Sequence, residues 1–192
     1  MAGINRAKPV LTLESYAYNK STSRIENKPC IFLSHNSSDK EDAVKIGDYI
    51  MEYADLDIYL DIYDDELQSA ATANDANAIT SLIERGISSS THTMCLVSEN
   101  TVKSWWVPFE LGYAKKSGID LCSLKLKGDI KLPEYLSISP ILMGTKSLNS
   151  YIDKIVSDWN SDGSIFKSKI NSSPIPYYIF SHPLDSVLDC AN

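Results

Sequence analysis

One residue whose type and spacing could support a chemical reaction is Glu110, which follows Trp106 by four positions in the stretch SWWVPFELGYA. Residues four apart share one face of a helix, so the indole and the carboxylate are expected on the same side, one turn apart. A single carboxylate beside a sugar can supply negative charge and accept hydrogen bonds from its hydroxyls, as in glycosyl transfer. Taken alone, Glu110 is better explained as a solvated surface residue, because glutamate is mostly exposed, and Trp106 is equally well explained as core packing.

A second group of polar side chains follows the apolar run at 30–33, which is typical of a short buried strand. Ser34, His35 and Asn36 come directly after it and could bind a ribose or a phosphate. Serine and asparagine also bond backbone groups in turns, so turn formation is the equal alternative. Asp61 follows a run of alternating apolar residues in the same way. It either contacts a ribose hydroxyl or caps the loop that follows, and we favour the cap.

Two further candidates stand just before Glu110 in the chain. Ser104 is expected to cap the helix that begins there, because serine oxygens accept hydrogen bonds from the first free N–H groups of a helix. A contact of Ser104 with a ligand is also open. Trp105 is the candidate for an exposed stacking surface, either for an aromatic ring of a ligand or for a neighbouring subunit.

Predicted strands and helices alternate along the chain and position these residues. Apolar runs and strict alternation predict strands over 30–33, 56–62, 94–97, 119–124 and 141–143. Helical spacing predicts four helices: one after a Ser38–Glu41 capping box, one around 79–83 that ends near Gly86, one from Ser104 to Lys116, and one over 148–159. A polar loop is predicted from Tyr63 to Asn74, before the second of these helices. This order predicts an α/β fold, a mostly parallel five-stranded sheet with helices on both faces. Ligands bind beyond the carboxyl ends of such strands, which selects the loops 34–37, 61–74 and 98–104.

The composition limits the classes of partner. The 192 residues carry 18 Lys and Arg against 25 Asp and Glu, a net charge of −7, so we expect neither nucleic acid nor an anionic membrane as a partner. The sequence shows no signal peptide and no apolar stretch of about 20 residues, which predicts a cytoplasmic protein. The four cysteines lack metal-ligand spacing, so we expect reduced thiols at Cys30, Cys95, Cys122 and Cys190 and no zinc site.

Three segments together resemble bacterial TIR (Toll/interleukin-1 receptor) domains. IFLSH at 31–35 is similar to the opening strand and loop of that family, and YLD at 59–61 stands where the family has its second strand and BB loop. LVS at 96–98 followed by SWWVPFELGYA at 104–114 is similar to the stretch that places the catalytic glutamate in NAD-cleaving members. The resemblance implies a flavodoxin-like TIR fold. It divides the chain into an N-terminal arm (1–28), a TIR domain (29–160) and a C-terminal extension (161–192).

The resemblance also implies an activity. NAD-cleaving TIR proteins break the nicotinamide–ribose bond of NAD+ by hydrolysis or cyclisation, which makes Glu110 the expected catalytic residue and NAD+ a substrate rather than a cofactor, with no metal. Small TIR proteins of this kind resemble the signal-producing partner of anti-phage systems such as Thoeris, in which a separate effector protein reads the nucleotide. The residues expected to bind the substrate are Ser34, His35, Asn36, Asp61, Ser104, Trp105 and Trp106.

Other classes of protein fit parts of the pattern. A non-catalytic TIR scaffold that acts by TIR–TIR association is the main alternative, and a nucleoside deoxyribosyltransferase shares the sheet and the carboxylate at the sugar. A receiver domain would need an acidic pair after the first strand to hold Mg²⁺, where this chain has Ser34-His35-Asn36. No GxGxxG motif supports NAD as a redox cofactor. The BB loop region at 64–72 is acidic and alanine-rich and lacks the usual proline–glycine pair, which leaves the mode of assembly open.

Overall fold

The structure is a computed structural model that describes residues 2–8, 28–161 and 181–189. Its centre is a five-stranded sheet in the order β2-β1-β3-β4-β5, in which every neighbouring pair is parallel. This is the flavodoxin-like order, and it confirms the predicted α/β fold. The strands are β1 (Cys30–Ser34), β2 (Asp57–Tyr59), β3 (His92–Val97), β4 (Asp120–Lys125) and β5 (Ile141–Met143).

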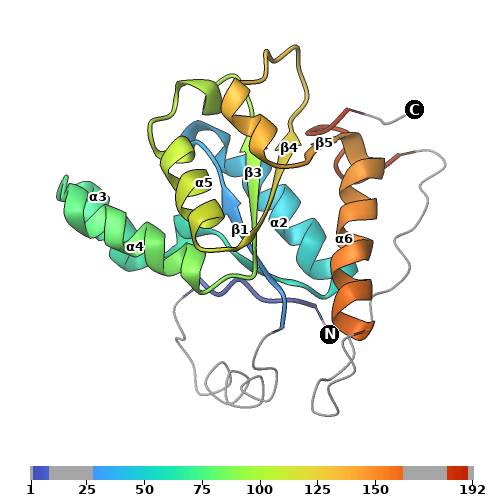
Figure 1. The fold of residues 1–192 in the computed structure, drawn as a ribbon, viewed down its shortest axis with the longest axis horizontal. Helices are drawn as coiled ribbons and strands as arrows, with labels where there is room; N and C mark the ends of the chain where they lie inside the picture. The colour runs from blue at the N-terminus through green and yellow to red at the C-terminus, as the bar shows by residue number, and fades with distance from the viewer. Residues whose placement is uncertain (1, 9–27, 162–180, 190–192) are drawn as a thin grey trace.

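Helices cover both faces of the sheet (Figure 1). On one face α2 (Lys40–Ala54) contacts α6 (Gly144–Ser161), and on the other α4 (Ala76–Ser88) contacts α5 (Trp106–Lys116). A further helix, α3 (Asp65–Thr72), packs against α4 and projects with it to the left in Figure 1. Short 3-10 helices lie between these elements: η2 (Ser37–Asp39), η3 (Asp61–Tyr63), η4 (Thr101–Lys103) and η5 (Glu134–Ile138).

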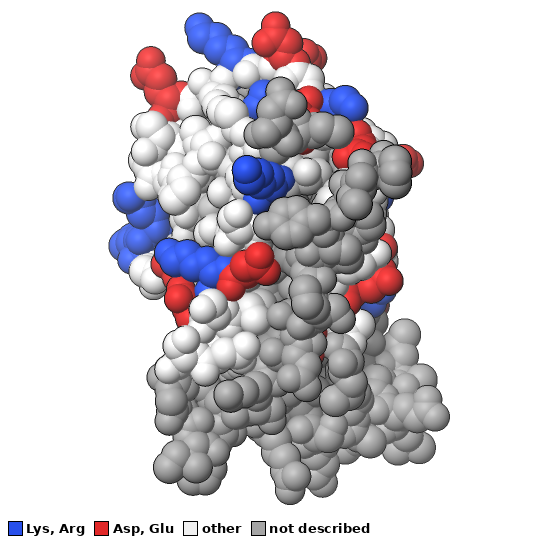
Figure 2. All heavy atoms as spheres, turned by 90° about the vertical axis from the view of Figure 1, so that its right-hand side faces the viewer, with Lys and Arg blue, Asp and Glu red and all other residues white. Residues whose placement is uncertain are grey.

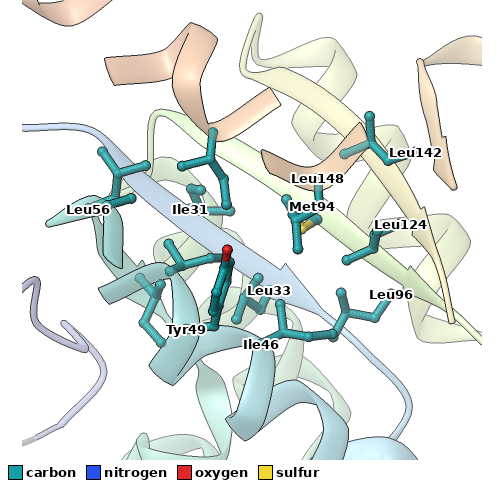
Figure 3. Packing of buried hydrophobic residues seen from close by; sticks show 14 of the residues in the cluster. Ile31, Leu33, Ile46, Tyr49, Leu56, Met94, Leu96, Leu124, Leu142 and Leu148 are labelled. Atoms are coloured by element: carbon teal, nitrogen blue, oxygen red, sulfur yellow. The ribbon is translucent and has the colours of Figure 1, made fainter. Parts of the chain in front are cut away.

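The larger apolar core lies between the sheet and the α2–α6 pair (Figure 3). Ile31 and Leu33 of β1 point into it beside Ile46 of α2 and Leu148 of α6, and all four side chains are fully buried. Phe32, between the two β1 residues, belongs to the cluster on the opposite face, as the alternation of strand side chains requires. Strand β1 is therefore fixed from both sides, and the polar residues that follow it stand on a rigid support.

Both described end segments pack against this body. Residues 2–8 run along the outer edge of β2, where Asn5 pairs with Ile58. In the segment 181–189, Leu184, Val187 and Leu188 are buried in the larger core. Aromatic residues of the tail are expected from the sequence to pack down, but Tyr177, Tyr178 and Phe180 lie outside the described residues, as does Cys190. The other three cysteines are buried free thiols.

The predicted polar loop from Tyr63 to Asn74 was wrong, because most of it is helix α3. Asp64 caps this helix by accepting hydrogen bonds from the N–H groups of Glu66 and Leu67, at 3.1 Å each. Leu67 and Ala70 are buried, which gives the helix an apolar face. The preceding strand is correspondingly shorter than predicted and ends at Tyr59, since residues 61–63 form η3.

Two helix ends also differ from the prediction. The capping box at Ser38 does not form: Asn36 accepts from the Ser38 N–H, and α2 begins only at Lys40. Helix α4 continues through Gly86 to Ser88. A Cβ at position 86 would lie 2.8 Å from the Tyr59 ring, so this glycine allows close packing of the helix on the sheet rather than ending it.

Charged residues are mixed in sign on the side shown in Figure 2, where acidic and basic side chains alternate over the coloured part of the surface. That side carries no broad single-sign area among the residues drawn in colour. Of the helices within residues 2–8, 28–161 and 181–189, none combines the length and the apolar character needed to cross a membrane.

Candidate functional site

A cavity of about 1000 Å³ opens beyond the carboxyl ends of β1 and β2. Its wall comes from six segments: the loop after β1, α2, η3, α3, α4, and the start of α5 with the serine before it. The sheet order reverses between β1 and β3, and the crevice at such a switch point is where open parallel sheets bind ligands. The fold therefore brings together loops that are far apart in the sequence.

Glu110 lies in the wall of this cavity and is 4% exposed. It stands in the second turn of α5, and its Oε2 accepts a hydrogen bond from the Ser34 hydroxyl at the end of β1. Burial raises the pKa of Glu110 to about 8, the Ser34 hydrogen bond opposes this rise, and the charge of Asp61 adds to it. The residue is not the solvated surface carboxylate that its sequence position alone favoured.

His35 and Asp61 form a second polar pair in the wall. His35 Nδ1 lies 3.1 Å from the Leu33 carbonyl and 3.7 Å from Asp61 Oδ1. The Leu33 carbonyl oxygen can only accept, so this contact is a hydrogen bond in the tautomer that carries a proton on Nδ1. Asp61 Oδ1 is buried and has no hydrogen-bond partner within the described part of the chain. Burial raises the pKa of Asp61, although the nearby His35 opposes the rise.

Asp61 was expected either to contact a ribose hydroxyl or to cap the following loop, and it does not cap helix α3. The cap of α3 is Asp64, which also accepts from the Tyr59 hydroxyl and lies 3.4 Å from Arg85. The Asp61 carboxylate is bonded to the backbone of residues 61 and 62 at the start of η3, and Asp61 lines the same cavity as Glu110. A carboxylate in such a position is available to accept hydrogen bonds from ligand hydroxyls.

The remaining sequence-predicted residues divide into two groups. Asn36, Ser104 and Trp106 line the cavity, and two of them also serve the backbone. Asn36 bonds the Ser38 N–H and the Asn100 carbonyl, and Ser104 accepts from the N–H groups of Trp106 and Val107 as predicted. Trp106 is 40% exposed and meets Phe109 edge to face, so it is not buried against the sheet. Trp105 is 92% exposed and does not line the cavity.

Several cavity residues had no signal strong enough to be chosen from the sequence. Lys40, Val44 and Lys45 line the cavity from one face of α2, and Tyr63 and Gln68 line it from η3 and α3. The spacing of Lys40 and Val44 on a helix could have placed them on one face, but only the packing of α2 shows which face meets the cavity. Sequence reasoning assigned the helix that holds Gln68 to a loop and so missed it.

Asp39 is another residue that the sequence did not single out. It is 8% exposed, and its Oδ1 accepts from Asn100 Nδ2 at 2.7 Å. Its other oxygen bonds the Ser98 hydroxyl in the loop after β3. Asp39 therefore ties the loop after β1 to the loop that leads into α5, and so fixes two sides of the cavity relative to each other.

The charged groups of the cavity come from both faces of the sheet. Lys40, Glu41 and Lys45 line it from α2, where Lys45 Nζ also lies 3.3 Å from Asp42 Oδ1, and Glu110 lines it from α5. Such a site can hold a ligand that carries both an anionic group and a developing positive charge. Within the described ranges, no group of three or more His, Cys, Asp or Glu residues is suitable for a metal ion.

Fold and site together define an α/β protein with a carboxylate-bearing cavity at the switch point of a parallel sheet. The sequence matches the family model of the TIR domain over residues 31–155, well over half of the chain. The chain belongs to the TIR domain family. Among solved structures, it is similar to the TIR domain of the Toll-related receptor TRR-2 from Hydra magnipapillata, with 16% identity and a TM-score of 0.46 over 58% of this chain and 82% of that chain. No curated protein matches the sequence.

Proposed function

We propose that this TIR domain protein cleaves the nicotinamide–ribose bond of NAD+, as a glycohydrolase or cyclase, and makes an ADP-ribose-derived signal nucleotide in bacterial anti-phage defence. The observation that carries the proposal is the Glu110 carboxyl group, 4% exposed, in the wall of a cavity of about 1000 Å³ and bonded to Ser34. A cavity of this volume is large enough for a dinucleotide. No resident cofactor is needed, since NAD+ is the substrate.

To cleave this bond, the protein has to place a negative charge beside the ribose and hold the substrate in position. The bond between ribose C1′ and the ring nitrogen breaks with its electron pair going to nitrogen, so nicotinamide leaves neutral and needs no general acid. The sugar is left as an oxocarbenium-like centre, which an ionised carboxylate beside it stabilises. The bond to C1′ is then remade by water, which gives up a proton, or by a nucleophilic atom of the product's own adenine or of another acceptor.

Glu110 has to be ionised for this role, although burial raises its pKa to about 8. The nicotinamide ring of NAD+ is a cation, and a cation within a few ångströms favours the charged form of a carboxylate. Substrate binding would thus favour the ionised form of Glu110, which burial disfavours. Asp61, which lines the cavity together with Glu110, would accept a hydrogen bond from a ribose hydroxyl.

The lysines of α2 fit the other end of the same molecule. Lys40 and Lys45 line the cavity from the helix opposite to the one that carries Glu110. Glu41 lines it beside them, and Lys45 Nζ lies 3.3 Å from Asp42 Oδ1. Their ammonium groups would attract the diphosphate, while the nicotinamide ring lies toward Glu110 and Asp61. We therefore place the anionic part of NAD+ at α2 and the scissile bond at α5.

The test is nicotinamide release from NAD+ by the purified full chain, followed by mass spectrometry, which also identifies the nucleotide made. Glu110→Gln keeps the side-chain volume and the acceptor for Ser34 but removes the charge, so we expect turnover to fall by about a thousandfold or more. Glu99→Gln, at an exposed glutamate outside the cavity, is the matched control and should be as active as the wild type. Equal turnover by the Glu110→Gln protein would refute the proposed role of this residue.

A specific observation favours the alternative of a TIR scaffold. Trp105 is 92% exposed and Val102, three residues earlier, is 44% exposed, so apolar surface is available for a second TIR domain. Trp105→Ala should then weaken association measured by analytical ultracentrifugation. A scaffold would keep that association in the Glu110→Gln protein and would leave NAD+ intact in the wild type.

A further inference from the structure

The segment 2–8 completes the sheet edge next to the cavity. Among the strands of the described residues, β2 has a partner on one side only, where it pairs with β1. On its other side, the Ile58 N–H donates to the Ile4 carbonyl at 2.9 Å, and the Ile58 carbonyl accepts from the Arg6 N–H at 2.8 Å. These bonds satisfy the outward-facing backbone groups of Ile58, as an added strand would.

Two residues after Ile58, the outward-facing N–H group of Leu60 is satisfied by the side chain of Asn5 instead of by a backbone group. The Leu60 N–H donates to Asn5 Oδ1 at 3.1 Å, and so does the Ala7 N–H. Asn5 is 8% exposed and Leu60 is 1% exposed, so water does not compete for these bonds. Leu60 is the residue directly before Asp61, where the backbone leaves the strand and turns into η3.

The segment reaches the cavity wall itself at Lys8. The Lys8 ammonium group lies 4.5 Å from the centre of the Tyr63 ring, and Tyr63 lines the cavity at the end of η3. Two residues before Lys8, Arg6 is bound to Asp57 at 2.9 Å and to the Lys28 carbonyl at 2.9 Å. The segment is thus anchored to β2 and contacts both ends of η3.

We propose that residues 2–8 position the Asp61–Tyr63 wall of the cavity, and that Asn5 is the positioning residue that sets the direction of Asp61. The inference rests on the proposed function, because Asp61 matters to catalysis only if the cavity binds the substrate. It gives this chain's own N-terminal residues a role in the site, although Asn5 itself does not line the cavity.

The structure offers a pair of substitutions that separates this role from a general effect on folding. Asn5 Nδ2 is buried without a hydrogen-bond partner among the described residues, so only Oδ1 is used. Asn5→Asp keeps an acceptor oxygen for the Leu60 N–H, whereas Asn5→Leu removes it. Arg6→Gln is the matched control, because it loosens the segment at Asp57 while leaving the Asn5 bonds in place.

Each full-length variant is assayed for kcat/KM with NAD+ and for amide hydrogen exchange at residues 60–63. We expect Asn5→Leu to lower kcat/KM about tenfold and to speed exchange of the Leu60 amide, since small displacements of a positioned group cost this much. Asn5→Asp should restore kcat/KM to within about twofold of the wild type. The proposal is wrong if Asn5→Leu speeds exchange but leaves kcat/KM unchanged, or if Arg6→Gln lowers kcat/KM equally at the same loss of melting temperature.

The two proposals fail in different ways. A wild-type protein that leaves NAD+ intact refutes the proposed function, and hydrogen exchange then still decides whether Asn5 orders the η3 wall. Unchanged exchange at Leu60 in the Asn5→Leu protein refutes the positioning role, whatever the activity.

Discussion

At Glu110, opposing influences act on one carboxyl group. Burial disfavours the charged form, the Ser34 hydrogen bond favours it and the charge of Asp61 disfavours it, with a net pKa of about 8. A group with such a pKa is near the middle of its titration at cellular pH, so small changes in its surroundings alter how much of the protein is ionised. This balance makes both activity and stability depend on pH in directions that can be derived.

The first prediction concerns the pH dependence of catalysis. The proposed mechanism requires the ionised form of Glu110, so kcat/KM should rise with pH through about 8 and then level off. Ser34→Ala removes the hydrogen bond that lowers this pKa, so the midpoint should move to higher pH. Steady-state rates from about pH 6 to about pH 10 measure it. Ser38→Ala, at an exposed serine outside the cavity, should leave the midpoint in place. A midpoint that stays put in Ser34→Ala contradicts the assignment.

The second prediction concerns stability. The pKa of Glu110 is about 8 in the folded chain and near 4.5 when unperturbed. Between these values the folded state holds a proton that the unfolded state has lost, so the free energy of unfolding falls as pH rises. Glu110→Gln removes this pH-dependent decrease in the free energy of unfolding, because glutamine does not titrate. Its melting temperature should exceed that of the wild type by roughly 3–8 °C at about pH 9, and by clearly less at about pH 5. The same difference at both pH values would mean that Glu110 titrates elsewhere.

At the scale of elements, Asp64 connects three of them. It caps α3, accepts from the Tyr59 hydroxyl on β2 and lies 3.4 Å from Arg85 on α4. Helix α3 supplies Leu67 and Gln68 to the cavity wall. The placement of that wall therefore depends on one buried carboxylate.

The third prediction follows from this connection. Asp64→Ala removes the cap and leaves the Tyr59 hydroxyl, in a side chain that is 7% exposed, without its acceptor. We expect a loss of about 2–4 kcal/mol in the free energy of unfolding, the sum of a helix cap and a buried unsatisfied group. Asp75→Ala is the matched control, since Asp75 caps α4 in the same way at an exposed site and should cost only about 1 kcal/mol. Urea unfolding measures both, and equal losses would show that the Tyr59 bond contributes nothing.

The elements differ in how far the sequence predicts them. The apolar run of β1 and the end of α5 are local signals: Lys115 and Lys116 occupy the last turn of that helix, and Gly118 has a φ of 72°. Helix α3 escaped prediction because its cap is held by Tyr59 and by Arg85, and Arg85 lies 21 residues further on. A polar segment that becomes a helix through contacts with distant residues cannot be distinguished from a polar loop by its own sequence.

The residues of the candidate site also differ in whether local sequence patterns predict their positions. The strand-end rule is enough to place Ser34, His35 and Asp61 at one edge of the sheet, because each follows a recognisable apolar run. The burial of Glu110 and the approach of Lys40 result from the packing of α5 and α2 on opposite faces, which no local pattern encodes. Trp105, the most conspicuous aromatic residue of the motif, is turned out of the cavity for the same reason.

At the scale of the whole molecule, both described end segments complete the body that residues 28–161 form. Residues 2–8 cover the edge of β2, and Leu184, Val187 and Leu188 of the segment 181–189 are buried in the larger core. The backbone of the second segment is bonded to the loop after β4, where the Lys127 N–H donates to the Val187 carbonyl at 2.8 Å. A boundary drawn at residue 160 from the resemblance alone leaves this core-filling segment outside the domain.

The fourth prediction measures what the 181–189 segment contributes. The Leu188 side chain is fully buried in the larger core, so Leu188→Ala removes apolar contacts and leaves a cavity. We expect the free energy of unfolding to fall by about 2–4 kcal/mol in urea titrations. Met143→Ala is the control at a side chain that is 55% exposed, and it should change stability by less than about 0.5 kcal/mol. Because Leu188 is far in sequence from the TIR match at 31–155, a loss this large means that the segment folds as part of the domain. A loss no greater than that of Met143→Ala would mean that the core is complete without it.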